Sequence, residues 1–258
     1  MRILLGAVAL AVLGAGAPAR AVTEQQGDLI VNFRGGIHPK KLPREEPAPV
    51  AVSVAGNVRS ASGNAEALPQ LRRITVAINR QGRLFDDGLP VCRAEAIQPA
   101  TERAARRICG PALVGNGHVV VQVRIPGQAN FFVHAKLLAF NGPRRSGHRL
   151  ILAQAYARKP PGAFILTFRV EHQGGTYGTV LSTKLPRGAQ QWAYLTHFDL
   201  TLHRTFSFRG ERRSYVSAAC GAPAGFNKAP FPFARATYGF AGGQQVTMSE
   251  AGVCSVAE

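Results

Sequence analysis

The chain has 258 residues and a formal net charge of +17 at pH 7, because 31 lysines and arginines outnumber 14 acids. This length is enough for one large domain with an ample core. After the first 21 residues no apolar run approaches the ~18 residues that a membrane-spanning helix needs. We therefore expect no transmembrane anchor.

The N-terminus has the three parts of a secretory signal peptide. Arg2 precedes an apolar run at 3–13, and residues 19–21 form a small-x-small cleavage site. The apolar run is too short to cross ~30 Å of hydrocarbon as a helix, and a buried N-terminal helix is the alternative. We expect a signal peptide over 1–21, a mature chain that begins at Val22, and a protein that is secreted or associated with the cell envelope.

Residues 22–49 are expected to form an N-terminal strand and a linker. Residues 29–34 are apolar enough for a strand, which we expect to end at Gly35 and Gly36. Four prolines lie between 37 and 49, and proline fixes φ and lacks a backbone donor, so this part should run extended over the surface. Residues 50–258 are expected to form the main domain.

From residue 50 onward, most segments alternate apolar and polar side chains. Turn signals rich in glycine and proline recur about every ten residues, as in antiparallel sandwiches. The expected strands are 50–54, 74–78, 118–125, 131–140, 149–157, 163–172, 177–183, 192–208, 214–219, 234–240 and 245–249. This pattern predicts a mainly β fold, an antiparallel β-sandwich of two packed sheets of a jelly-roll-like or immunoglobulin-like kind, with one short helix.

The helix is expected at 99–108. Thr101 suits its N-cap, and Glu102 suits the positive end of the helix dipole. Arg106 and Arg107 suit the opposite end, and the glycine and proline at 110–111 should terminate the helix.

The clearest strand spans 196–208. Alternate apolar residues from Phe198 to Phe208 would face the core, with Arg204 as the exception, while His197 and Asp199 would face water. At ~3.3 Å per residue this strand would exceed ~35 Å. We therefore expect a bulge or bend near Arg204.

Four cysteines, Cys92, Cys109, Cys220 and Cys254, follow the expected cleavage site. An even number in an exported chain predicts two disulfides, and four free thiols are the alternative. Because loop closure favours near neighbours, we expect Cys92 to pair with Cys109 and Cys220 to pair with Cys254.

Four short motifs carry a resemblance to known proteins: LPVCR at 89–93, CGPALVG at 109–115, YGTVL at 177–181 and PFPFARA at 230–236. With its four cysteines, the chain resembles a group of secreted, β-rich proteins, mostly from actinobacteria, that have no known activity. The resemblance covers most of 50–256. It implies a shared secreted β fold and shared cysteines, and it brings no substrate, cofactor or catalytic residue.

His197 and Asp199 are the candidate catalytic residues, because a histidine and an acid ~6.6 Å apart on one strand face can serve zinc or a general base. A solvated polar strand face is the alternative. No Gly-x-Ser-x-Gly motif occurs, and Asp86-Asp87-Gly88 favours a turn over a calcium loop. We expect no cofactor and no metal.

Removing Arg2 and Arg20 with the signal peptide lowers the net charge from +17 to +15. A basic exported protein is drawn to anionic surfaces, although coding bias toward arginine is an alternative cause. No aromatic residues interleave with the basic ones, so no nucleic-acid partner is expected. The candidate basic surface consists of Arg72, Arg73, Arg103, Arg106, Arg107, Arg144, Arg145, Arg212 and Arg213.

Two functions remain open at this point. The first is an exported, non-catalytic protein that binds an anionic cell-envelope polymer or an extracellular glycan. The second is a secreted hydrolase with an unfamiliar site at His197 and Asp199. A deep cleft with converging polar side chains would favour the hydrolase.

Overall fold

The computed structural model describes residues 21–64, 68–185 and 192–257. The expected signal peptide therefore lies outside the described residues, apart from Ala21. Strands dominate the described chain, which confirms the predicted mainly β fold. Its division into the two packed sheets of a sandwich stays a prediction.

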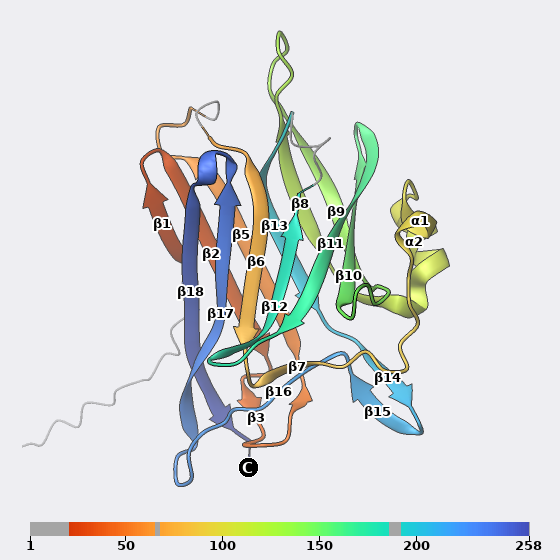
Figure 1. Cartoon of the computed structure of the whole chain (residues 1–258), viewed down its shortest axis with the longest axis vertical. Helices are drawn as coiled ribbons and strands as arrows, with labels where there is room; N and C mark the ends of the chain where they lie inside the picture. Colours follow the sequence, from red (N-terminus) through yellow and green to blue (C-terminus); the bar gives the residue numbers. More distant parts are fainter. Residues whose placement is uncertain (1–20, 65–67, 186–191, 258) are drawn as a thin grey trace, which may run out of the picture.

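Thirteen strands form one large curled sheet in the order β1-β2-β5-β13-β8-β9-β10-β11-β12-β6-β17-β18-β3 (Figure 1). Neighbours are antiparallel except for the parallel pair β18 and β3. The bounds are β1 (Val22–Gln26), β2 (Leu29–His38), β3 (Lys41–Leu42), β5 (Ala51–Ser60), β6 (Leu71–Asn79), β8 (Leu113–Val123), β9 (Phe131–Asn141), β10 (Arg149–Arg158), β11 (Pro161–His172), β12 (Tyr177–Lys184), β13 (Ala193–Leu202), β17 (Lys228–Phe240) and β18 (Gln245–Val256).

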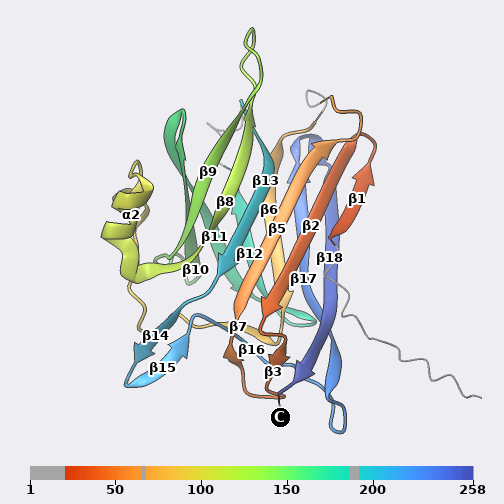
Figure 2. The ribbon, with the colours of Figure 1, turned by 180° about the vertical axis from the view of Figure 1, so that it is seen from behind.

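Two small sheets lie at one end of the large sheet, which we call the foot (Figure 2). One consists of β4 (Ala48–Pro49), β16 (Val216–Ala218) and β7 (Gly82–Leu84), and the other is the hairpin of β14 (Thr205–Phe208) and β15 (Glu211–Ser214). The predicted long strand is thus divided between β13 and β14, with the break at His203 and Arg204, where the bend was expected. The N-terminal strand expected at 29–34 corresponds to β2, and its expected end at Gly35 and Gly36 is wrong, because β2 continues to His38.

The sheet curls until its two ends meet, and β1 and β2 come to lie beside β18 and β17 (Figure 2). We call this contact the seam. The Gln26 side-chain amide donates to the Gln245 carbonyl over 3.1 Å, and the Gly35 N–H donates to the Glu250 carboxylate over 3.3 Å. A Cβ on Gly35 would lie 2.2 Å from the Phe233 ring, so the close approach of β2 to β17 requires glycine at this position.

The concave face of the sheet carries the apolar core. On the seam side the core is filled with large rings, from Phe33 on β2 and from Phe231, Phe233, Tyr238 and Phe240 on β17. On the opposite side many inward residues of β9 and β10 are small: Ala135, Ala139, Ala153, Ala155 and Ala157 alternate on this face with only Leu137 and Ile151 as large buried neighbours. The two sides of the interior are therefore filled to different extents.

Two helices, α1 (Ala94–Ile97) and α2 (Glu102–Cys109), lie outside the curled sheet beside β10 (Figure 1). The Thr101 hydroxyl accepts the N–H of Ala104 over 3.2 Å, which confirms the predicted N-cap. Only α2 was expected. The helix α1 is too short to give a periodic sequence signal.

The helices pack on the outer face of β9 and β10. Leu138, Phe140 and Leu152 from these strands form a small core with Ile97 and Ala105. The fully buried Gln154 side chain donates to the carbonyls of Ile97 and Ala100, at 2.6 and 2.7 Å. Hydrogen bonds and apolar contacts therefore fix the helices to the back of these two strands.

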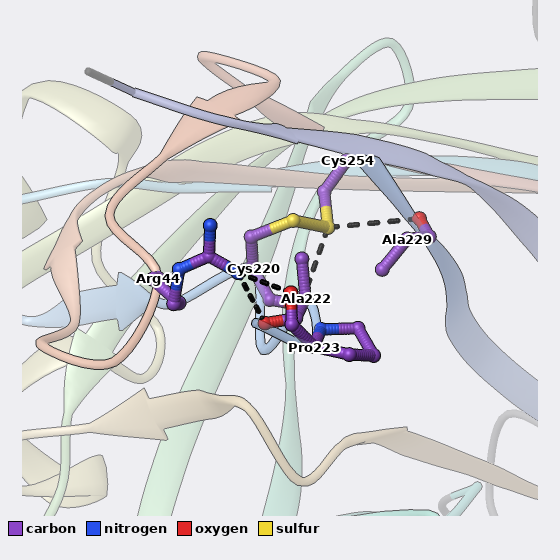
Figure 3. The surroundings of a disulfide bond; sticks show 6 residues. All are labelled: Arg44, Cys220, Ala222, Pro223, Ala229 and Cys254. Carbon is purple, nitrogen blue, oxygen red and sulfur yellow. Dashed lines mark hydrogen bonds between the residues drawn. A yellow bond between two sulfur atoms is a disulfide. The ribbon is translucent and has the colours of Figure 1, made fainter. Parts of the chain in front are cut away.

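Both predicted disulfides are present. Cys92 pairs with Cys109 at a Cα–Cα distance of 5.5 Å, and Cys220 pairs with Cys254 at 5.6 Å. The second bridge ties the segment after β16 to β18, and the nearby Arg44 guanidinium donates to the carbonyls of Ala222 and Pro223 (Figure 3). The second bridge therefore joins the large sheet to a segment outside it, whereas the first joins the segment before α1 to the end of α2.

Replacing each cysteine pair with serine should lower the free energy of unfolding. The chain-entropy model gives about 3 kcal/mol for Cys92→Ser/Cys109→Ser and about 4 kcal/mol for Cys220→Ser/Cys254→Ser, because the second loop is longer. Urea unfolding of secreted protein measures both values. Free energies equal to that of the unmodified chain would contradict this account.

The seam should make stability depend on pH through Glu250. Burial raises the pKa of this carboxyl, while the Gly35 N–H and the nearby Arg34 act to lower it. Since the folded-state pKa is raised, stability is greatest below the unfolded pKa and falls as pH rises through the folded pKa. The Glu250→Gln variant keeps an acceptor for Gly35 and cannot ionise, so its stability relative to the unmodified chain should increase between about pH 4 and pH 7.

The matched control for this measurement is Glu24→Gln, which removes an exposed carboxylate from the neighbouring strand β1. The same pH dependence in both variants would assign the effect to the loss of one negative charge and would exclude a destabilising buried carboxylate at the seam.

Candidate ligand-binding cavity

A cavity of about 260 Å³ lies inside the curled sheet, on the side away from the seam. It is bounded by β8, β9, the β10–β11 turn, β11 and the start of β13. A second cavity of about 70 Å³ lies deeper, and the two share Val119, Leu166 and Leu195 in their walls. The hollow therefore reaches from one end of the sheet into the centre of its core.

Small side chains on the concave face account for the larger cavity. Ala135 and Ala157 are direct partners across β9 and β10, and both face the hollow. Gly162, Ala163 and Ala193 complete this part of the wall. Larger residues at these positions would fill the space, as the rings of β17 do on the seam side.

The apolar lining is only partly buried. Phe164, Phe168 and Phe198 point into the interior from β11 and β13, yet they remain half-buried. Pro161 and Gly162 line the cavity and are exposed, so the hollow reaches solvent where β10 turns into β11. We call this end of the sheet the mouth. It is opposite the foot (Figure 1).

The lining determines what the cavity can bind. All the residues around both hollows have apolar side chains or none, so the side chains of the walls offer neither hydrogen bonds nor charge. A cavity of ~150 Å³ with such walls stays dry and binds benzene. At the same density of carbon atoms, the larger hollow would hold roughly ten carbons.

The predicted catalytic pair lies elsewhere. His197 and Asp199 are on the convex face of β13, with 3.3 Å between the imidazole Nε2 and the carboxylate Oδ2. His118 of β8 approaches the same oxygen to 3.5 Å, and Asn57 lies 2.7 Å from the other imidazole nitrogen of His197. The structure thus brings the pair together and adds His118, and all three side chains are partly exposed to solvent.

No group of three or more histidine, cysteine, aspartate or glutamate side chains is arranged to hold a metal ion in the described part of the chain. A hydrolase at His197 and Asp199 stays a prediction.

A polar groove of about 400 Å³ occupies the foot. His38 at the end of β2, with His203 and Arg204 between β13 and β14, lines it. The Nε atom of Arg204 is buried and has no hydrogen-bond partner among the described residues. Arg204, the charged exception in the predicted apolar face, therefore lines a groove at the foot and lies outside the apolar core, which explains its place in the pattern.

The predicted basic surface does not come together. Arg72 and Arg73 are on β6, Arg103, Arg106 and Arg107 are on α2, Arg144 and Arg145 are in the β9–β10 turn, and Arg212 and Arg213 are on β15. Several of them are engaged by acids: Arg106 by Glu102, Arg144 by Asp86 and Asp87, and Arg213 by Glu211. Of these groups, only the β6 pair lies at the mouth, where Arg73 is the partner of Lys184.

Sequence reasoning missed the cavity, although a signal was present. The strand at 149–157 has alanine at 153, 155 and 157, on the face that its other residues assign to the core. Three small residues in succession on a core face predict unfilled space unless the opposite wall supplies bulk. Which strands form the opposite wall depends on the strand order, and the sequence alone does not give that order.

Neither described helix has the length and apolar character that a membrane crossing needs. Comparisons of the chain with protein-family models, with curated proteins and with solved structures find no match. The resemblance to secreted actinobacterial proteins therefore stays a prediction.

Proposed function

We propose that this chain is an exported, non-catalytic binding protein that holds the hydrocarbon part of a lipid-like molecule inside the curled sheet. The observation that carries the proposal is a hollow of about 260 Å³, lined by apolar side chains, that reaches solvent at one end of the sheet. Ligand sites are typically concave, apolar and preformed. In this proposal the facing walls of the sheet act as the two layers of the predicted sandwich, with the ligand between them.

Export is part of the proposal. It is supported by the signal-peptide pattern and by two disulfides, which form and persist outside the cytoplasm. The anionic envelope partner inferred from net charge remains a prediction. A lipid-like ligand with an anionic head is compatible with it.

Binding should depend on chain length in a linear alcohol series. Each methylene moved from water into the cavity contributes ~0.8 kcal/mol, or about fourfold in affinity. We expect affinity to increase by this factor per carbon up to roughly ten carbons and then level off, because the cavity is full. Titration calorimetry and the rise in Tm with alcohol concentration measure it.

An alcohol series without a plateau, or without any rise in Tm, would show that the hollow binds no chain. Neutral alcohols are the appropriate probes here, since their binding does not depend on the net charge of the protein.

Filling the cavity should abolish this binding. Ala157→Leu and Ala135→Leu each place a branched side chain in the hollow, where space is available, so we expect stability to change by less than about 1.5 kcal/mol. Decanol affinity should fall at least tenfold in each variant. The matched control is Ala251→Leu on an exposed position of β18, which should bind decanol as the unmodified chain does.

A further inference from the structure

Three large aromatic side chains are exposed at the mouth. Phe131 and Phe132 begin β9, and Trp192 precedes β13, with exposed fractions of 36%, 56% and 38%. The two aromatic segments lie on either side of Val123 of β8, which is the strand partner of both Phe131 and Ala193. The aromatic residues therefore surround strand ends that form the wall of the cavity.

Cationic side chains lie at the same end of the sheet as these rings. Arg158 and Lys159 form the turn from β10 into β11, and Lys184 ends β12 next to the cavity residue Leu185. All three are exposed, and none forms an ion pair with an acid in the described chain. The segments 121–135, 156–166, 183–185 and 192–196, which surround the mouth, contain no aspartate or glutamate.

This combination distinguishes the mouth from the other exposed apolar residues. Of the other exposed large apolar residues in the described chain, Val91, Ile108, Phe226 and Val253, only Phe226 is aromatic. Tryptophan and other aromatic residues with lysine and arginine around them are typical of surfaces that contact lipid headgroups. Each cation near an anionic leaflet adds to the attraction, and the net charge of the whole chain acts in the same direction.

We propose that the mouth docks on the surface of an anionic lipid bilayer, with Phe131, Phe132 and Trp192 at headgroup level and Arg158, Lys159 and Lys184 facing the lipid phosphates. The cavity then opens onto the bilayer, where a hydrocarbon chain can enter it without crossing water. This inference rests on the proposed function, because it makes the bilayer the source or destination of the cavity's ligand. The β8–β9 hairpin, which rises beyond the rest of the sheet, stands at this end (Figure 1).

The chain's one tryptophan, Trp192, is a built-in reporter for docking. The full mature protein is mixed with vesicles of phosphatidylcholine alone, or of phosphatidylcholine with phosphatidylglycerol. We expect co-sedimentation and a blue shift of tryptophan emission with the anionic vesicles only, both decreasing as salt is added. If millimolar inorganic phosphate releases the protein from the vesicles, the cationic side chains bind free phosphate in preference to lipid headgroups, and the proposal is overturned.

Charge variants test where docking occurs. Arg158→Gln/Lys159→Gln/Lys184→Gln should weaken binding to anionic vesicles on the order of 100-fold, since each cation contributes about fivefold. The matched control, Arg209→Gln/Arg212→Gln/Lys228→Gln, removes the same charge from exposed positions at the foot. An equal loss in both triple variants would mean that net charge alone attracts the protein, and the mouth would not be a docking surface.

An apolar pair provides a second and independent test. Phe132→Ser should weaken vesicle binding about tenfold. Phe226→Ser, at a more exposed ring at the foot, should leave it unchanged. No effect of Phe132→Ser would exclude insertion of the aromatic residues.

Decanol titration separates this inference from the proposed function. The mouth variants change no residue of the cavity wall, so they should bind decanol normally while losing vesicle binding. Ala157→Leu should do the reverse. For the unmodified chain, normal docking without decanol binding would refute the proposed function, and decanol binding without docking would refute the inference drawn here.

Discussion

The closure of the sheet at the seam is the constraint on which the rest of the structure depends. No continuous backbone ladder joins β2 to β17 and β18, so the two ends are held by side chains and a few isolated hydrogen bonds. Gly35 allows the Phe233 ring to approach the backbone of β2, and its N–H reaches Glu250. If these contacts were lost, the sheet could open, and the concave face would no longer enclose a hollow.

The two sides of the interior have different roles: the seam side stabilises the fold, and the opposite side contains the cavity. The rings of β2 and β17 fill the seam side and provide most of the large buried apolar side chains there. The alanines of β9 and β10 leave space on the other side, and this loss of packing would weaken the wall if nothing supported it. Support comes from outside, where α1 and α2, clipped by Cys92–Cys109, pack on Leu138, Phe140 and Leu152.

Features that depend on local signals could be predicted from the sequence, and features that depend on strand order could not. Thr101 was identified as a cap, and Cys92 and Cys109 as partners, because each depends on residues near in sequence. The seam joins Gly35 to Glu250, 215 positions apart, and no periodicity reveals such a contact. His197 and Asp199 were placed together correctly from strand spacing alone, whereas His118 required knowledge that β8 lies beside β13.

The same distinction explains why net charge was a poor guide to the surface that matters. The basic pairs that stand out in the sequence are spread over separate elements, and the few acids lie beside several of them, as Asp86 and Asp87 do at Arg144 and as Glu102 does at Arg106. Those local pairs cancel much of the charge on the helices and at the β9–β10 turn. Arg158 and Lys159 are adjacent and Lys184 lies 25 positions further on, yet the fold brings all three to one end of the sheet, where the segments that surround the mouth contain no acid. The positive charge of the chain therefore attracts an anionic surface most directly where nearby acids are missing. This is the end of the sheet at which the apolar cavity reaches solvent.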